Sequence, residues 1–169
     1  MKKLLFILIY FMVALCGCGF AQREVCGVAF GSSYNTTKNA LQKKFGYCDN
    51  ADKNEIVYYN KIYGGVFFSR IMFEFQYDYY GRGYFNSCIM ACDCLSVVDA
   101  RLKARRLSGM LSKYDMEEIT NTDGTTYYIG GIDPTDSSHY GVMVYVAQWS
   151  NGCGAAIAYG PYNYVQEGF

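Results

Sequence analysis

The sequence predicts an α+β protein in which two helices pack on one side of an antiparallel sheet. Two observations support this fold class. Each of two segments with helical periodicity is followed by segments that alternate between apolar and polar residues, as half-buried strands do. Tyrosine and phenylalanine, present 18 and 11 times, supply the large side chains that strands favour. We therefore expect each helix to lead into its own group of strands.

The first 21 residues have the features of a secretion signal. Lys2 and Lys3 precede an apolar run over residues 4–15, which is too short to span a bilayer as a mature helix. Small residues follow this run, and cleavage after Ala21 would leave Gln22 as the mature N-terminus. We therefore expect an exported protein of the periplasm, the cell envelope or the extracellular space.

Two other fates of this segment remain open. Residues 15–18 resemble a lipobox, in which Cys18 would be acylated and would hold the protein at a membrane. Retention of the apolar run as an anchor helix is the third alternative. Apart from these cases, a membrane is not an expected partner.

The remaining residues, 22–169, have the length of a single domain with its own core. Basic and acidic residues number 15 each, and two of the lysines lie in the signal. The mature part is therefore slightly acidic. A nucleic-acid surface needs a basic excess, so we expect no nucleic-acid partner.

A short strand and a helix are expected first. Residues 24–30 have the composition of a strand, and residues 34–45 have the spacing of an amphipathic helix. Ser33 is expected to cap the start of this helix, and Gly46 to end it. A polar loop follows.

Three strands are expected next, over residues 56–63, 66–80 and 84–92. The middle one shows the clearest alternation. Its expected core face carries Phe67, Ile71, Phe73, Phe75, Tyr77 and Tyr79. Its expected solvent-exposed face carries Arg70, Glu74, Gln76 and Asp78.

The second helix begins in a capping box formed by Ser96 and Asp99. Its apolar side carries Ala100, Ala104, Leu107, Leu111 and Tyr114. A solvated face is expected for Arg101, Lys103, Arg105 and Arg106. Four strands follow, over residues 117–121, 125–130, 140–149 and 154–165.

The two halves show a weak internal repeat. At an offset of about 69 residues, Tyr58 and Tyr59 coincide with Tyr127 and Tyr128. We expect pseudo-repeats over about 28–92 and 95–165, each a helix followed by three strands.

This order resembles the tandem helix-plus-meander architecture of β-lactamase-inhibitor proteins and of small outer-membrane lipoproteins of the barrel-assembly machinery. The first helix follows a Gly-Ser step at Gly31 and Ser32 and ends at Phe45 and Gly46, as helices of those families do. The resemblance covers residues 28–149 and implies a protein-binding or inhibitor-like role.

Six cysteines beyond the signal favour disulfides, because exported proteins keep few free thiols. If residues 87–95 are extended, the three cysteines in this segment share one face of the strand. Their side chains are then either too far apart to form a disulfide with one another or point in parallel directions. They would then pair with the other three, which leaves six connectivities open. The first set is Cys88, Cys92 and Cys94, and the second is Cys26, Cys48 and Cys153.

No catalytic, metal or cofactor site is expected. His139, the only histidine, is predicted to lie about ten strand residues from Cys153, or roughly 30 Å at 3.3 Å per residue, which is too far for a dyad. Asp133, Asp136 and Ser138 have the composition of a turn more than of a calcium loop.

We therefore expect a non-catalytic module that binds a protein of the envelope through exposed aromatic residues. Carbohydrate binding is one alternative, and an enzyme that uses Glu74 and Asp78 is another. The candidate contact residues are Tyr77, Tyr79, Tyr80, Tyr84, Tyr159, Tyr162 and Tyr164.

Overall fold

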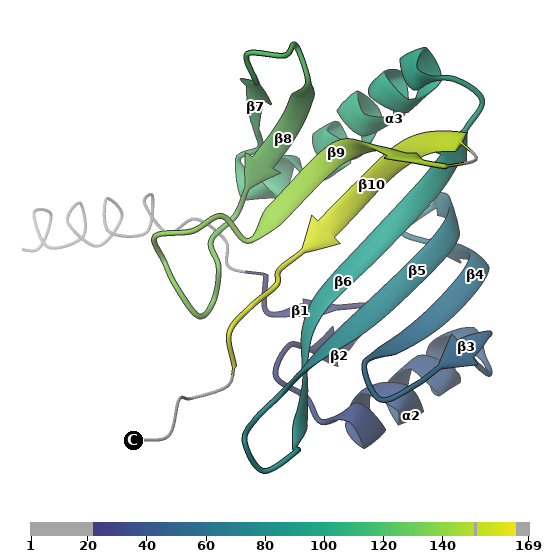
Figure 1. The fold of residues 1–169 in the computed structure, drawn as a ribbon, viewed down its shortest axis with the longest axis vertical. Helices are drawn as coiled ribbons and strands as arrows, with labels where there is room; N and C mark the ends of the chain where they lie inside the picture. The colour runs from purple at the N-terminus through teal and green to yellow at the C-terminus, as the bar shows by residue number, and fades with distance from the viewer. Residues whose placement is uncertain (1–21, 151, 165–169) are drawn as a thin grey trace, which may run out of the picture.

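Two helix-and-meander units meet at the centre of one antiparallel sheet (Figure 1). The computed structural model describes residues 22–150 and 152–164, so the expected signal with its processing sites at Cys18 and Ala21 lies outside the described residues. In the described part of the chain, no helix is long and apolar enough to cross a membrane.

The first unit follows a small N-terminal hairpin. The hairpin consists of β1 (Glu24–Val25) and β2 (Val28–Ala29). The unit comprises α2 (Tyr34–Phe45), β3 (Asn50–Ala51), β4 (Glu55–Tyr63), β5 (Val66–Tyr77) and β6 (Gly83–Cys94).

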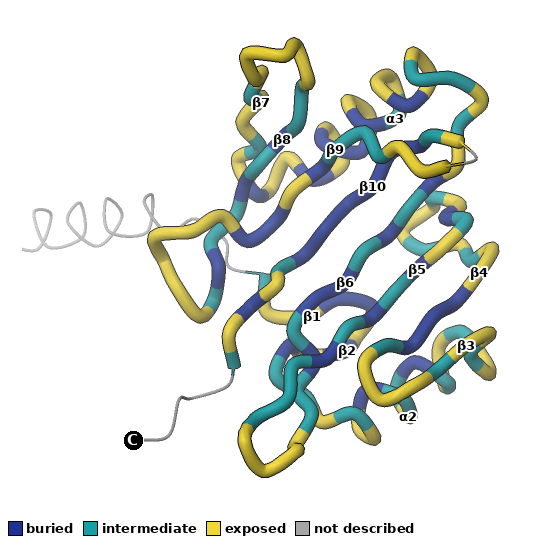
Figure 2. Tube along the Cα trace, in the orientation of Figure 1, coloured by how far each residue is buried: buried dark blue, intermediate teal, exposed yellow. Residues whose placement is uncertain are grey.

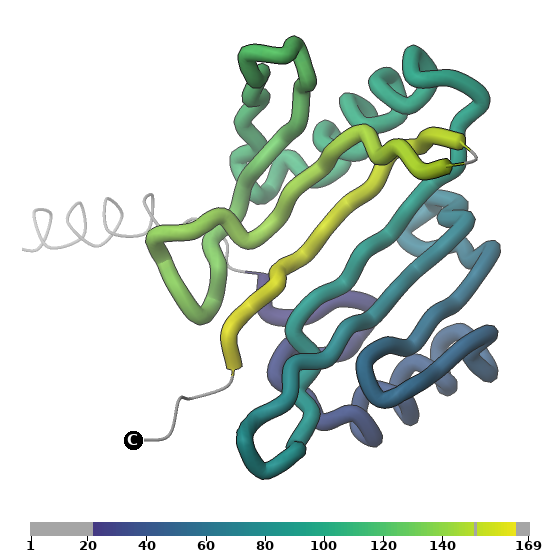
Figure 3. The backbone as a smooth tube through the Cα atoms, in the orientation of Figure 1, coloured from purple at the N-terminus to yellow at the C-terminus, as the bar shows by residue number. Residues whose placement is uncertain are grey.

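The second unit repeats this plan, and its last three strands are shorter than those of the first. It comprises α3 (Val97–Met110), the 3-10 turn η1 (Ser112–Tyr114), β7 (Glu117–Thr120), β8 (Thr126–Gly130), β9 (Val142–Trp149) and β10 (Gly152–Tyr159). In the colour gradient of Figure 3, the first unit runs from purple to teal and the second from teal through green to yellow.

The sheet order β3-β4-β5-β6-β10-β9-β8-β7 places the last strands of the two units side by side. β6 and β10 pair antiparallel, from Cys94 opposite Cys153 to Cys88 opposite Tyr159. This arrangement confirms the predicted fold class of two helices on one antiparallel sheet. β3 was not predicted, because a strand of two residues has no alternation to detect.

The helices begin as the capping residues predict. The Ser33 hydroxyl accepts the Thr36 N–H at 3.3 Å, and Gly46 ends α2 with a φ of 83°. The Ser96 hydroxyl accepts the Asp99 N–H at 3.1 Å and donates to the Asp99 carboxylate at 2.6 Å. Both predicted caps are confirmed.

The core lies between the sheet and the two helices, and it contains a large cluster of packed aromatic rings. The rings of Phe30 and Phe85 stack with centroids 4.5 Å apart, and Tyr162 meets Phe30 edge-on at 4.6 Å. Phe73 and Phe75 pack against Phe85 from β5. Figure 2 shows the buried positions concentrated in the central strands. Close aromatic packing of this kind dominates core energetics.

The prediction of a single strand over residues 24–30 is wrong. Cys26 and Gly27 adopt φ values of 56° and 79°, so the chain reverses there and forms the β1–β2 hairpin. Val25, Cys26, Val28 and Phe30 are all buried. The hairpin therefore contributes to the core instead of adding a strand to the large sheet.

The core face predicted for residues 66–80 is correct from Ile71 to Phe75 but wrong at Phe67 and at Tyr79. Tyr79 lies beyond the end of β5 at Tyr77 and is 97% exposed. Phe67 is 54% exposed, whereas its neighbour Phe68 is 2% exposed. The strand alternation breaks at Ser69, whose hydroxyl donates to the Ala91 carbonyl at 3.1 Å and accepts the Asp93 N–H at 3.2 Å. Opposite this point in the β4–β5 ladder, Asn60 has a φ of 54°. This local break turns Phe67 to the surface and Phe68 to the core.

Adjacent phenylalanines should therefore respond differently to truncation. We predict that Phe68→Ala lowers the free energy of unfolding by about 3–5 kcal/mol, because it empties a buried site. Phe67→Ala should change it by about 0.5 kcal/mol or less. Urea denaturation followed by circular dichroism measures both. Equal losses in the two variants would contradict the register described above.

Candidate functional site

The two faces of the sheet are covered differently. Along β6, Cys88, Met90 and Cys92 point to the helices and are buried. Ile89 and Ala91 alternate with them on the opposite face and remain partly accessible. Both helices lie behind the sheet in the view of Figure 1, and this second face is turned to the viewer. We call it the open face.

A groove of about 470 Å³ crosses the centre of the open face. Strands β4, β5, β6, β10 and β9 each contribute to it. Its lining residues are Tyr59, Ser69, Arg70, Met72, Ile89, Ala91, Asp93, Tyr145, Ala147, Trp149 and Ala156.

The hollow arises from the sizes of the side chains. The two central strands contribute alanines, Ala91 from β6 and Ala156 from β10. The strands on either side contribute large aromatic groups, Tyr59 from β4 and Tyr145 and Trp149 from β9. Side chains stand roughly perpendicular to a sheet, so small ones between large ones leave a trough. The trough is therefore encoded in alternating strand positions.

Trp149 lies over glycines of the neighbouring strand. A Cβ atom placed on Gly152 would lie 3.0 Å from the indole Nε1, and one on Gly154 would lie 2.6 Å from the indole Cη2. The absence of side chains at these positions allows the indole to lie close to β10. Trp149 nevertheless remains 40% exposed, so it can contact a ligand.

Two charged side chains of opposite sign border the groove. Arg70 and Asp93 are exposed, and neither forms an ion pair with another described residue. The Arg70 guanidinium lies 3.1 Å from the Met72 sulfur. The groove thus combines an apolar centre with polar groups that a bound partner can pair.

A second exposed aromatic feature is the turn between β5 and β6. Tyr79 and Tyr80 are 97% and 79% exposed, and their rings meet edge-on with centroids 5.5 Å apart. Asp78 orders this turn, because its carboxylate accepts the N–H groups of Tyr80 and Arg82 at 2.9 Å and the Arg82 guanidinium at 2.6 Å. We call residues 78–82 the tyrosine turn.

The seven predicted contact tyrosines do not form one surface. Tyr79 and Tyr80 are exposed in the tyrosine turn, and Tyr77 and Tyr84 are half-buried beside it. The Tyr77 hydroxyl donates to the Lys53 carbonyl, and the Tyr84 hydroxyl donates to Asp78.

The prediction that Tyr159 and Tyr162 contact a partner is wrong, since both are buried in the core and offer no surface to a partner. Tyr164 is half-buried, and its ring meets the ring of Tyr162 edge-on. Burial raises the pKa of Tyr159 and of Tyr162 well above its usual value. Tyr159 lies opposite Cys88 on the helix-side face of the sheet. Tyr162 lies beyond β10, which ends at Tyr159, so the alternation expected over 154–165 does not continue.

The six cysteines all carry free thiols in the structure, so the predicted disulfides are not confirmed. The predicted shared face is observed, since the helix-side face of β6 carries Cys88, Cys92 and Cys94. On the neighbouring strand β10, these cysteines are opposite Tyr159, Ala155 and Cys153, respectively. Burial raises the pKa of Cys26 to about 12 and that of Cys92 to about 11.

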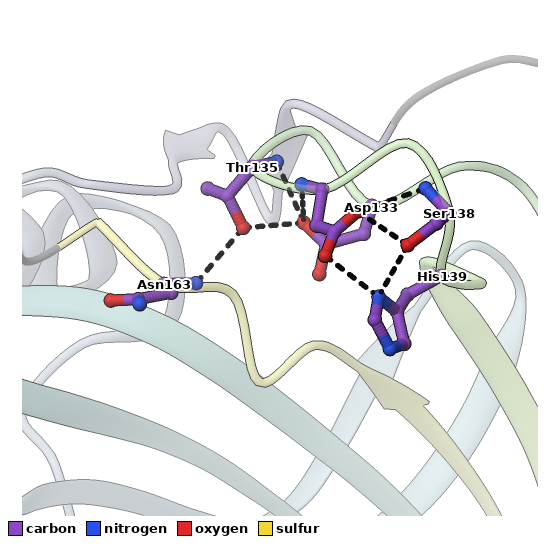
Figure 4. Close-up of polar contacts among 6 residues, drawn as sticks. Asp133, Thr135, Ser138, His139 and Asn163 are labelled. Atoms are coloured by element: carbon purple, nitrogen blue, oxygen red, sulfur yellow. Dashed lines mark hydrogen bonds and ion pairs between the residues drawn. The ribbon is translucent and has the colours of Figure 1, made fainter.

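The loop around His139 is a structural turn (Figure 4). The Asp133 carboxylate accepts the Thr135 N–H at 2.7 Å and the Thr135 hydroxyl at 2.6 Å. Thr135 in turn accepts the Asn163 N–H at 3.0 Å, and His139 lies 2.9 Å from Asp136. The contacts of Asp133 and Asp136 order the loop, and the hydrogen bond between Thr135 and Asn163 ties it to the C-terminal segment.

The acidic residues considered for catalysis have structural partners. Glu74 accepts the Ser87 hydroxyl, and Asp78 orders the tyrosine turn. His139 and Cys153 lie at opposite ends of the β9–β10 hairpin. Among residues 22–150 and 152–164, no group of three or more His, Cys, Asp or Glu side chains is placed to hold a metal ion.

The groove was not foreseen from the sequence, although its residues obey simple alternation. Tyr145, Ala147 and Trp149 occupy every second position of β9, and Tyr59 belongs to the tyrosine pair of the internal repeat. Their convergence depends on the strand order. No family model, curated protein or solved structure matches the chain.

The contact between Trp149 and Gly154 can be tested by adding one methyl group. We predict that Gly154→Ala lowers the free energy of unfolding by about 1–3 kcal/mol, because its Cβ would overlap the Cys92 carbonyl oxygen and meet the indole. Trp149 is the only tryptophan, so its fluorescence reports the displacement directly.

Gly152→Ala is the matched control, because its Cβ meets only the movable indole. It should shift the fluorescence with a smaller loss of stability. Unchanged emission and stability in Gly154→Ala would show that the indole does not lie over β10.

Proposed function

We propose that the protein is an exported, non-catalytic binding module of the cell envelope, which holds another protein against the groove of the open face. The tyrosine turn provides a second contact. The observation that carries this proposal is the groove itself, in which Tyr59, Tyr145 and Trp149 surround a floor of alanines.

The composition of the groove favours a protein partner. Tryptophan, tyrosine and arginine are the residues that most often dominate binding energy at protein interfaces. In the groove they surround a hollow that fits a large apolar side chain, and Arg70 and Asp93 are available to pair with polar groups around it. Rigid strands, rather than loops, hold these side chains, so little conformational entropy is lost on binding.

The architecture is consistent with an inhibitor-like role. The tandem arrangement of helix and meander resembles that of β-lactamase-inhibitor proteins, and this resemblance is one of architecture only. Engaged carboxylates at Glu74 and Asp78 support the non-catalytic part of the proposal.

Export is the second component of the proposal, and it rests on residues 1–21. Intact mass of the protein recovered from an expressing bacterium should match a chain that starts at Gln22 or one acylated at Cys18. A mass that includes residues 1–21 would contradict processing by either route.

Truncation of the groove aromatics should abolish binding. We predict that Tyr59→Ala and Trp149→Ala each weaken the affinity for a protein captured from envelope extract by tenfold or more, as interface anchors do. Tyr47→Ala is the matched control, because Tyr47 is exposed and does not line the groove. The affinity is measured by surface plasmon resonance, with circular dichroism to verify folding.

The double variant Tyr79→Ala and Tyr80→Ala separates the two contact regions. Loss of affinity only in this variant would move the binding site from the groove to the tyrosine turn. Equal affinities in all variants would overturn the proposal.

Carbohydrate binding is the second candidate, and one observation favours it. Exposed aromatic rings beside Arg70 and Asp93 provide both stacking surfaces and hydrogen-bonding groups for a sugar. Binding of the wild-type protein to an envelope polysaccharide array, lost in Trp149→Ala and retained in Tyr47→Ala, would favour this candidate over a protein partner.

A further inference from the structure

Cys94 and Cys153 are the only two cysteines of the described chain that face each other directly across neighbouring strands. Residues opposite each other in an antiparallel pair point to the same side and have Cα atoms about 4.5–5.5 Å apart. Disulfides join residues whose Cα atoms lie about 4.4–6.8 Å apart. The backbone therefore already holds these two residues at a separation that a disulfide can bridge.

The contacts of the two thiols agree with this placement. The Cys153 sulfur lies 3.8 Å from the Cys94 carbonyl oxygen, which places it over the strand of its partner. The Cys94 sulfur lies 3.8 Å from the Cys92 carbonyl oxygen. Both side chains are partly accessible, so a soluble oxidant can reach them.

The nearest competitor is Cys92, and its position disfavours it. Cys92 is opposite Ala155, so it is a diagonal neighbour of Cys153, at about 7–8 Å in an antiparallel sheet. Its thiol is buried and donates to the Phe67 carbonyl at 3.3 Å. Cys92 and Cys94 cannot bond to each other, since their side chains run parallel from the same strand.

The remaining three cysteines are not opposite Cys94 or Cys153 in the strand register. Cys88 is opposite Tyr159 and is buried, and Cys26 is buried in the turn of the N-terminal hairpin. Cys48 lies in the loop that precedes β3. None of the three is opposite another cysteine in the strand register.

We propose that Cys94 and Cys153 form a disulfide bond that joins the two units of the protein across the seam between β6 and β10. In the oxidation, the thiolate of one cysteine attacks the S–S bond of a disulfide oxidant such as oxidised glutathione, forms a mixed disulfide and releases the first thiol of the oxidant. The thiolate of the second cysteine then attacks the mixed disulfide, forms the Cys94–Cys153 bond and releases the second thiol. The two cysteines lose two protons and two electrons, and the oxidant is reduced to two thiols.

The bond acts at one end of the groove. Cys153 lies one residue beyond Gly152, which pairs with Trp149 at the end of the β9–β10 hairpin. A link from Cys153 to Cys94 fixes this end of the hairpin to β6. It also closes a covalent loop that contains α3 and strands β7 to β9, which restricts the unfolded chain.

Peptide mapping of the full chain tests this pairing. The purified protein is equilibrated with oxidised glutathione, its remaining thiols are alkylated without reduction, and it is digested. One linked peptide should contain Cys94 and Cys153, lighter than its two separate parts by the mass of two hydrogen atoms. Alkylation of both cysteines, or a link from either to another cysteine, would overturn the proposal.

Variants supply a readout that does not depend on mapping. Reduction should lower the urea midpoint of the wild-type protein and of Cys48→Ser. It should leave the midpoints of Cys94→Ser and Cys153→Ser unchanged, because these variants lack the bond. A midpoint that falls equally on reduction in all four proteins would contradict the proposal.

This inference is independent of the proposed binding function. If the bond is absent, the peptide map and the effect of reduction on the urea midpoint differ from those expected. If the binding function is absent, the affinities of the groove variants differ from those expected. The fluorescence of Trp149, measured on oxidised and reduced protein, reports whether the bond also alters the groove.

Discussion

The pairing of β6 with β10 is the contact on which the rest of the structure depends. It joins strands that lie about one repeat apart in the sequence, so it is formed against a considerable loss of chain entropy. Each unit alone would be a narrow sheet with one helix on one side. Joined at this seam, the two units form a single eight-stranded sheet with a shared core and an open face. The groove exists only in the joined sheet, since its lining comes from both units.

Small residues at the seam serve both faces of the sheet. On the helix side, Ala155 of β10 and Ala100 and Ala104 of α3 are buried, so the helix can pack closely against the strand. On the other side, Ala156 forms part of the groove floor. The same stretch of small side chains thus permits tight packing behind the sheet and a hollow in front of it.

Much of the fold was predictable, because helices and strands are encoded locally. Ser33, Ser96 and the alternation from Ile71 to Phe75 specified their elements correctly. Phe67 was misplaced because the break at Ser69 depends on hydrogen bonds from β6, which no local pattern records. Tyr162 was misplaced because the chain leaves the sheet after Tyr159 and returns its aromatic ring to the core beside Phe30.

The candidate site was less predictable than the fold for a similar reason. Tyr59 and Trp149 are far apart in the sequence, and only the strand order brings them to one groove. Tyr79 and Tyr80 were among the predicted contact residues, but the turn that exposes them was not predicted, because the strand was expected to run to residue 80 and β5 ends at Tyr77. The facing cysteines required the register of β6 and β10, which is a non-local property.

The margins of the sheet restrict how a partner can approach. One margin is the short β7, in which Glu117 and Glu118 are exposed, and the other is β4 with the two-residue β3 beside it. Asn60, with its positive φ, and Lys61 interrupt the free length of β4. Short, charged and kinked margins resist the addition of a foreign strand. Recognition by β-augmentation is thus disfavoured at both ends, and so is end-to-end polymerisation of the protein into fibres.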